Sequence, residues 1–223
     1  RKNGFCVVSA GDIILGQDIR DFHAIPGHFS GIIGGSPCQD FSRARRTAPT
    51  GYGLEMIAQY VRIVTEGSPD WFLLENVPGV PSVTVPGYTV LRFDLSPNDL
   101  GYAQRRPRHF QFGSKIGWVL DIHRQDFNGE TIPTLTASDG RRSVRRTFED
   151  FCRLQGLQSA LHLPDLTQTA RYKVVGNGVH AAVAFEVARA ILEATTKPVP
   201  DTIFTVNVCA CGCGRRVTGK QKS

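Results

Sequence analysis

The chain has 223 residues, of which 41% are hydrophobic and 21% are charged, and this is enough apolar material for one sizeable core. Lysine and arginine number 26 against 20 aspartate and glutamate residues, and the net charge of +6 favours a polyanionic partner such as nucleic acid. The sequence has no apolar run long enough to cross a membrane and no secretory signal, so we expect a soluble cytoplasmic protein.

The first informative element is the apolar run of residues 31–33, which predicts a short buried strand, followed at once by the segment Gly-Gly-Ser-Pro-Cys-Gln-Asp-Phe-Ser. This places Cys38 at the carboxyl end of a strand, where α/β folds put ligands and chemistry. Pro37 fixes the backbone before the thiol, and the preceding glycines allow a close approach. Cys38 is therefore either a nucleophile or a small buried residue near a turn, and its surroundings alone do not decide between the two.

A second strand is predicted over the apolar run of residues 71–74, which ends in Glu75 and Asn76. Between the two strands, apolar residues recur at helical spacing, namely Leu54, Ile57, Val61 and Val64. A strand, helix, strand unit sets two parallel strands side by side. We therefore expect Cys38 and Glu75 to face one pocket.

Two basic stretches flank these elements. Residues 104–108, Gln-Arg-Arg-Pro-Arg, precede a weakly alternating run at 109–113 that predicts a strand, so Arg106 and Arg108 are expected to point to one side. The loop of residues 42–53 is basic, contains glycine and lacks apolar periodicity. This pattern is typical of a mobile lid over a phosphate backbone, with a plain solvated loop as the alternative.

These motifs, followed by Arg-Leu-Gln-Gly at residues 153–156 and Gly-Asn-Gly-Val at residues 176–179, resemble the DNA (cytosine-5) methyltransferase family. The resemblance runs from about Asp18 to Ala190. It implies an α/β fold: a Rossmann-like, S-adenosylmethionine-dependent methyltransferase with a three-layer α/β/α sheet that lacks its first βα unit. It also implies a minimal target-recognition subregion.

The chemistry of this family explains the residue types. Carbon 5 of cytosine is a poor nucleophile, so the resemblance assigns Cys38 to attack carbon 6 of a base rotated out of the duplex. Glu75 would act as general acid and base reader, with Asn76 orienting this corner. Arg108 would contact the flipped cytosine, and Arg106 would brace the catalytic loop or a phosphate. A solvated basic strand edge is the alternative for both arginines.

The resemblance also implies contacts to DNA and to the methyl donor. Expected DNA-binding residues are Gln39, Ser42, Arg43, Arg45, Arg46 and Gln104. Expected S-adenosylmethionine-binding residues are Asp18, Pro37, Asn177 and Val179, with Asp12 as a rival to Asp18 for the adenine amine. The family's glycine-rich cofactor loop is absent and the chain does not begin with methionine. We therefore expect a truncated sequence with weak or absent activity.

The carboxyl-terminal part is expected to supply scaffold. Residues 134–138 and 146–156 resemble the motif that supports target recognition, and the apolar pattern of residues 179–191 predicts a largely buried helix that includes Phe185. Asn177 would lie at the start of that helix, either as a cofactor contact or as a cap.

The resulting domain prediction has four parts. Residues 1–113 form a partial catalytic core, 114–157 a reduced target-recognition and scaffold region, 158–197 a return to the core, and 198–223 a linker with a cysteine-rich tail. Residues 114–132 are too few for an independent recognition domain. Metal binding is not expected, except that Cys209, Cys211 and Cys213 look like half of a zinc module without a fourth ligand.

Three functions stay open. The leading one is methylation of double-stranded DNA, by a solitary enzyme of a phage or mobile element or by half of a restriction system with a cognate endonuclease as partner. The second is an RNA cytosine-5 methyltransferase on the same scaffold, and the third is a catalytically inert DNA-binding relative.

Overall fold

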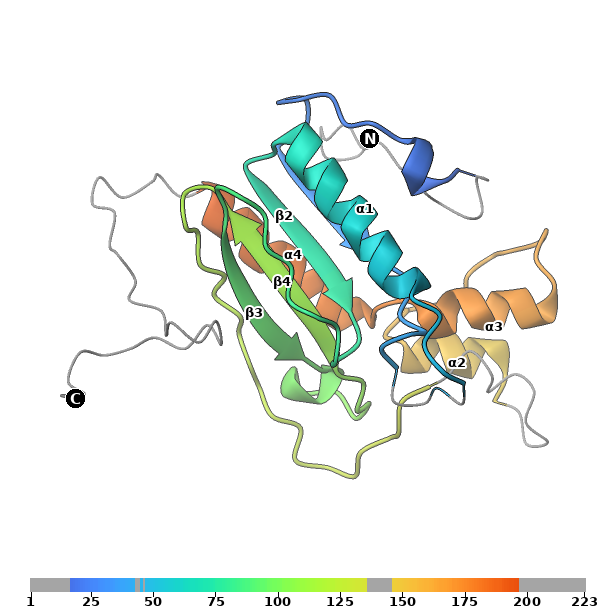
Figure 1. Cartoon of the computed structure of the whole chain (residues 1–223). Helices are drawn as coiled ribbons and strands as arrows, with labels where there is room; N and C mark the ends of the chain where they lie inside the picture. The colour runs from blue at the N-terminus through green and yellow to red at the C-terminus, as the bar shows by residue number, and fades with distance from the viewer. Residues whose placement is uncertain (1–16, 43–44, 46, 136–145, 197–223) are drawn as a thin grey trace. The chain divides into compact units, whose positions relative to one another are not determined.

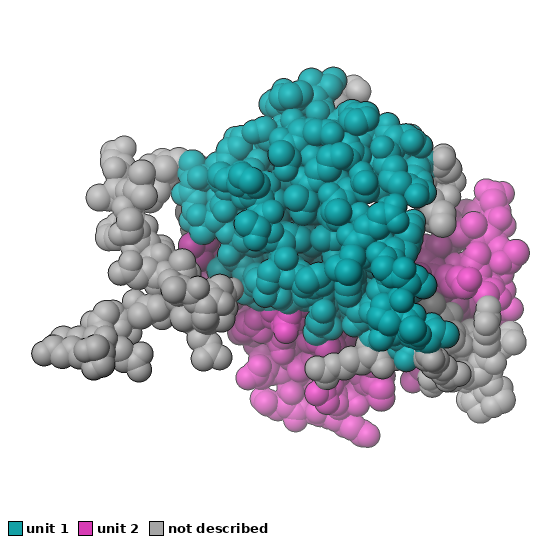
Figure 2. Space-filling model, viewed as in Figure 1, with its two compact units in different colours: residues 1–93, 109–118, 204–223 teal, residues 94–108, 119–203 magenta. Residues whose placement is uncertain are grey.

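A computed structural model of the chain describes residues 17–42, 45, 47–135 and 146–196. The chain divides into two compact units, shown in teal and magenta in Figure 2. Residues up to 93 together with 109–118 belong to the first unit, and residues 94–108 together with those from 119 to the end of the last helix belong to the second.

A four-stranded sheet has the order β1-β2-β4-β3 (Figure 1). Its strands are β1 (Gly31–Gly35), β2 (Trp71–Asn76), β3 (Thr89–Leu95) and β4 (Arg108–Ser114). Strand β1 pairs with β2 in parallel, and Gly35 lies opposite Glu75 in the register. Strand β4 pairs with β2 in the antiparallel sense. The predicted strands at 31–33, 71–74 and 109–113 and the parallel pairing are thereby confirmed. The expected burial of the first strand is wrong: β1 lies at the edge of the described sheet, none of its residues is buried, and Ile33 is 66% exposed.

Helix α1 (Tyr52–Gly67) connects β1 to β2 and lies along them, as Figure 1 shows. Its buried face joins Phe72 and Leu74 of β2 in one hydrophobic cluster. The Tyr60 ring lies so close to β1 that a Cβ on Gly34 would be 2.3 Å from Tyr60 Cε2, so this position requires glycine. The predicted helix is confirmed, but Leu54 is 54% exposed because it lies on a different side of the helix from the buried stripe, which begins with Gly53 and Met56.

Strand β4 differs from its weak alternating pattern because all its residues after Arg108 are buried. The side chains on both faces of β4 are therefore covered, so buried and exposed residues do not alternate along this strand. The Gln111 amide supports this by donating to the carbonyl of Pro81 (2.8 Å) and accepting from the backbone N–H of Val83 (2.8 Å). Strand β3 was not predicted from the sequence.

The described residues of the second unit form a core of their own and include three α-helices. Helices α2 (Phe148–Leu154) and α3 (Gln168–Asn177) start at threonine N-caps, and α4 (Ala181–Thr196) follows. The core consists of Leu135, Phe151, Cys152, Tyr172 and Val175.

Two expectations for this unit were wrong. Phe185 on α4 is 73% exposed, whereas Val183, Val187 and Ile191 form the buried stripe of that helix. Asn177 is the last residue of α3, so it ends one helix instead of starting the next. Among the described residues no single helix is long and apolar enough to cross a membrane; by length and composition alone, α3 and α4 pass that test only as a pair bent by 41°.

Candidate active site

Cys38 lies on the loop that leaves β1, and its side chain is partly exposed. The buried side chain of Asn76, at the end of β2, holds the beginning of this loop. Its amide donates to the carbonyl of Ser36 (3.0 Å) and to the Ser36 hydroxyl (3.3 Å), and its own oxygen accepts from the Val77 N–H (2.8 Å). Asn76 therefore fixes the backbone two residues before the thiol.

The carboxylate of Glu75 extends over the end of the neighbouring strand. Gly35 is its partner in the β1–β2 register, and a Cβ built on Gly35 would lie 3.4 Å from Glu75 Oε2. Gly35 is the last residue of β1, and Cys38 follows three residues later. The structure thus brings the thiol-bearing loop and the carboxylate to the same end of two adjacent parallel strands, as the sequence predicts.

Asp18 precedes the short 3-10 helix η1 (Ile19–Asp21) and caps it. Its carboxylate accepts from the backbone N–H of Arg20 (2.9 Å) and forms an ion pair with the Arg20 guanidinium (2.6 Å). These contacts with Arg20 lower the pKa of Asp18 to about 2. Asp18 is therefore an ionised, partly exposed acceptor at neutral pH, which suits an exocyclic amine as ligand.

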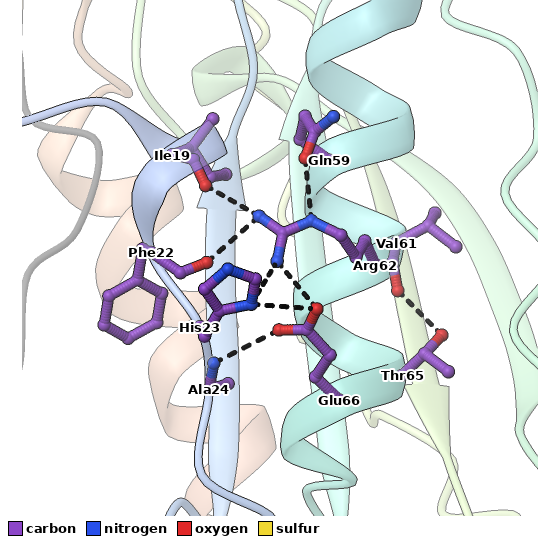
Figure 3. Close-up of polar contacts among 9 residues, drawn as sticks. All are labelled: Ile19, Phe22, His23, Ala24, Gln59, Val61, Arg62, Thr65 and Glu66. Carbon is purple, nitrogen blue, oxygen red and sulfur yellow. Dashed lines mark hydrogen bonds and ion pairs between the residues drawn. The ribbon is translucent and has the colours of Figure 1, made fainter.

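The segment around η1 is held to α1 by Arg62, as Figure 3 shows. The Arg62 guanidinium donates to the carbonyls of Ile19 (2.8 Å) and Phe22 (3.0 Å) and to the Glu66 carboxylate (2.8 Å). Glu66 in turn accepts from the backbone N–H of Ala24 (3.3 Å), and Arg62 lowers the pKa of Glu66. Arg62 and Glu66 are one helical turn apart, a spacing that indicates an ion pair, but the contact with the segment around η1 carries no signal in the sequence.

The expected DNA-binding residues of the loop after Cys38 are only partly described. Gln39 and Arg45 are exposed and Ser42 is half-buried, whereas Arg43 and Arg46 lie outside the described residues. The Arg45 guanidinium donates to the carbonyl of Asp40 (2.5 Å), which keeps this side chain over the loop that it belongs to.

In the second unit Arg106 is only 2% exposed. Its guanidinium donates to three backbone carbonyls, those of Leu135 (2.6 Å), Gly176 (2.6 Å) and Gly178 (3.0 Å). Its backbone N–H donates to the Ser96 hydroxyl (2.9 Å). Arg106 therefore braces the turn between α3 and α4. A phosphate contact would require a guanidinium that points to solvent, and that of Arg106 does not.

Gln104 also differs from its expected DNA contact. It is buried, and its amide donates to the carbonyl of Leu154 at the end of α2 (2.8 Å). The cause is that residues 104–107 do not continue strand β4 but run alongside the scaffold segments of this unit, with Gln104 bridged to Ile132. Alternation along a strand therefore does not govern their side chains.

The remaining expected residues are placed as follows. Arg108 begins β4, is half-buried, and donates to the carbonyl of Pro107 (3.0 Å). Asn177 is exposed, whereas Val179 and Pro37 are half-buried. Asp12, Cys209, Cys211 and Cys213 lie outside the described residues, and within the part of the chain that the structure describes no cluster of metal-ligating side chains occurs.

His180 is a buried residue of the second unit, and no pattern in the sequence marks it. Its Nδ1 accepts from the backbone N–H of Ala182 (3.2 Å), and a Cβ on Gly156 would lie 2.7 Å from its ring. Burial, followed by the charge of Arg106, lowers the pKa of His180 to about 4. The imidazole is therefore neutral at physiological pH.

This titration predicts a pH dependence of stability. Because the unfolded chain protonates His180 near pH 6.5 and the folded chain only near pH 4, acidification across this window favours unfolding, by about 3 kcal/mol at most. His180→Asn keeps an acceptor for the Ala182 N–H but cannot titrate. We expect urea unfolding at pH 7 and pH 4.5 to show a smaller loss of stability in the variant. An equal loss in both proteins would contradict this.

Comparison with known proteins identifies the fold and the family of the chain. The architecture is the α/β Rossmann-like methyltransferase fold: the structure is similar to the Entamoeba histolytica methyltransferase EhMeth (TM-score 0.60, 12% identity, 75% of this chain and 78% of that one). It is also similar to S. pombe Dnmt2 (TM-score 0.53, 14% identity, 75% and 79%). The family model for C-5 cytosine-specific DNA methylases matches residues 3–144, and the chain belongs to this family.

Curated relatives are type II methyltransferases. M.SacI of Streptomyces achromogenes is 28% identical over 182 residues, which are 73% of this chain and 43% of that protein. M.XorII of Xanthomonas oryzae pv. oryzae is 41% identical over 116 residues, 45% of this chain and 27% of that protein. The chain thus spans less than half the length of these relatives.

Proposed function

We propose that this protein transfers a methyl group from S-adenosylmethionine to carbon 5 of a flipped-out cytosine in double-stranded DNA. The observation that carries the proposal is the meeting of the Cys38 loop and the Glu75 carboxylate at one end of the β1–β2 pair. Membership of the C-5 cytosine-specific DNA methylase family supports a role of this thiol and this carboxylate in the methylation of cytosine.

The proposed reaction begins with attack of the Cys38 thiolate on carbon 6 of cytosine. The new carbon–sulfur bond moves the electron pair of the 5,6 double bond onto carbon 5, and Glu75 supports this by hydrogen bonding or proton donation at ring nitrogen 3. Asn76 keeps the Cys38 backbone in place through Ser36. After methylation, a base removes the proton from carbon 5 and the thiolate leaves carbon 6. Arg108 is proposed to contact the flipped base.

S-adenosylmethionine supplies an electrophilic methyl group when bound. The ionised Asp18 carboxylate is proposed to accept a hydrogen bond from the exocyclic amine of the cofactor's adenine. The exposed Asn177 and the half-buried Val179 are proposed to contact the methionine part of the cofactor. The family description supports DNA as substrate, and the type II names of the relatives support a restriction-modification setting. We further propose that the DNA is double-stranded, that a cognate endonuclease is a partner, and that the protein acts in the cytoplasm.

An isotope-release experiment tests the base-attacking half of this proposal without a methyl donor. Addition of the thiolate to carbon 6 makes carbon 5 basic; it takes a proton from water, and loss of the original hydrogen followed by departure of the thiolate restores cytosine. We expect the chain to release tritium to water from double-stranded DNA that carries [5-³H]cytosine, faster than from single-stranded RNA of the same sequence. Preferential release from RNA would move the substrate to the second candidate, and release from neither would contradict the proposal.

A further inference from the structure

A carboxylate two residues after Cys38 joins the thiol-bearing loop to the start of helix α1. Asp40 Oδ1 accepts from the backbone N–H of Thr50 (2.9 Å), and Oδ2 accepts from the backbone N–H of Gly53 (2.9 Å). The Thr50 hydroxyl lies 3.2 Å from each oxygen. Asp40 therefore closes the base of the loop between residues 40 and 53.

Helix α1 lacks a side-chain cap from its own N-cap residue. It begins after Gly51, which has a φ of 82° and no side chain to accept a hydrogen bond. The first N–H groups of a helix have no acceptor within the helix, and a carboxylate near them is favoured by the helix dipole. Asp40 supplies this acceptor from outside the helix. The hydrogen bonds from Thr50 and Gly53 lower the pKa of Asp40, so the carboxylate is ionised at neutral pH.

The neighbouring residue, Phe41, reinforces the same contact. A Cβ on Gly53 would lie 2.9 Å from Phe41 Cε2 and 3.2 Å from the Asp40 Cβ, so the approach of the loop to α1 depends on glycine at this position. Phe41 packs against the cluster beneath α1, and its N–H donates to the carbonyl of Cys38 (3.1 Å). The residues after Cys38 are thus held to α1 by Asp40 and Phe41, and the residue two positions before it, Ser36, is held to β2 by Asn76.

We propose that Asp40 is a positioning residue that clamps the Cys38 loop to the first turn of α1 and thereby sets the approach of the thiol to carbon 6 of the base. The inference rests on the proposed function. It assigns to Asp40 no contact with DNA. Its effect passes through the backbone between the clamp and the thiol, a path of two residues.

The test replaces Asp40 by asparagine, which keeps the size of the side chain but turns one acceptor oxygen into an NH₂ group facing a backbone N–H. Asp70→Asn, at an exposed position next to β2, is the matched control. At saturating DNA we expect Asp40→Asn to release tritium from carbon 5 about 10- to 100-fold more slowly, because small displacements of a nucleophile cost that much. The DNA concentration for half-maximal rate should change less than about 3-fold, since the clamp does not bind DNA.

Two outcomes would overturn the proposal: a rate equal to that of the unmodified protein, or a loss no larger than the loss of folded protein measured by circular dichroism in the same buffer. If the unmodified protein releases no tritium, the proposed function fails and the clamp is tested separately. Iodoacetamide should then alkylate Cys38 at least about 3-fold faster in Asp40→Asn than in Asp70→Asn, as resolved by peptide mass spectrometry, because the loop opens locally. Equal alkylation rates would contradict the clamp.

Discussion

Replacing Cys38 by alanine is expected to reduce tritium release from carbon 5 of cytosine to the rate of the uncatalysed reaction. The side chains that orient the base stay in place, but without the thiolate no bond to carbon 6 forms, and carbon 5 does not become basic. Folding should be nearly unchanged, because Cys38 is partly exposed and contributes little to the core.

Cys152→Ala is the matched control for this prediction. Cys152 is the other described free cysteine and is fully buried in the core of the second unit. Its removal should lower stability modestly and leave the rate per folded molecule unchanged. Tritium release by Cys38→Ala at the rate of the unmodified protein would exclude Cys38 as the nucleophile.

Replacing Arg106 by lysine is expected to lower the free energy of unfolding by about 3–5 kcal/mol, a large share of the 5–15 kcal/mol typical of a domain. The planar guanidinium reaches three carbonyls at once, those of Leu135, Gly176 and Gly178. A single ammonium group lacks this fork, so buried carbonyls would lose their donor.

Urea unfolding measures this effect, with Arg105→Lys as the control. Arg105 is exposed, and it is its backbone, not its guanidinium, that bonds to the carbonyl of Ile132 (2.8 Å). The control should stay within about 0.5 kcal/mol of the unmodified protein. Equal stabilities of the two variants would show that Arg106 is not the brace described above.

The parts of the site that the sequence predicts are those determined by local pattern. Apolar runs locate β1 and β2, helical spacing locates α1, and the connection between them requires the parallel pairing that brings Glu75 to the end of β1. The resemblance to the family assigns Cys38 and Glu75 to the site, because the proposed chemistry needs a thiol and a carboxylate together.

The parts that the sequence does not predict depend on contacts between distant segments. Gln104 and Arg106 read as exposed basic and polar residues, but their partners lie tens of residues away, at Leu154 and Gly176, and these partners bury them. Asp40 likewise obtains its role from Thr50 and Gly53. No local periodicity contains this information.

The central claim is that the Cys38 sulfur adds to carbon 6 of a cytosine in DNA, and a stable adduct measures this most directly. Double-stranded DNA that contains 5-azacytosine accepts the thiolate at carbon 6, and the displaced electron pair is protonated on nitrogen 5. After denaturation and digestion, mass spectrometry should locate the nucleotide on the peptide that contains Cys38. A nucleotide on any other residue, or no covalent complex at all, would contradict the account.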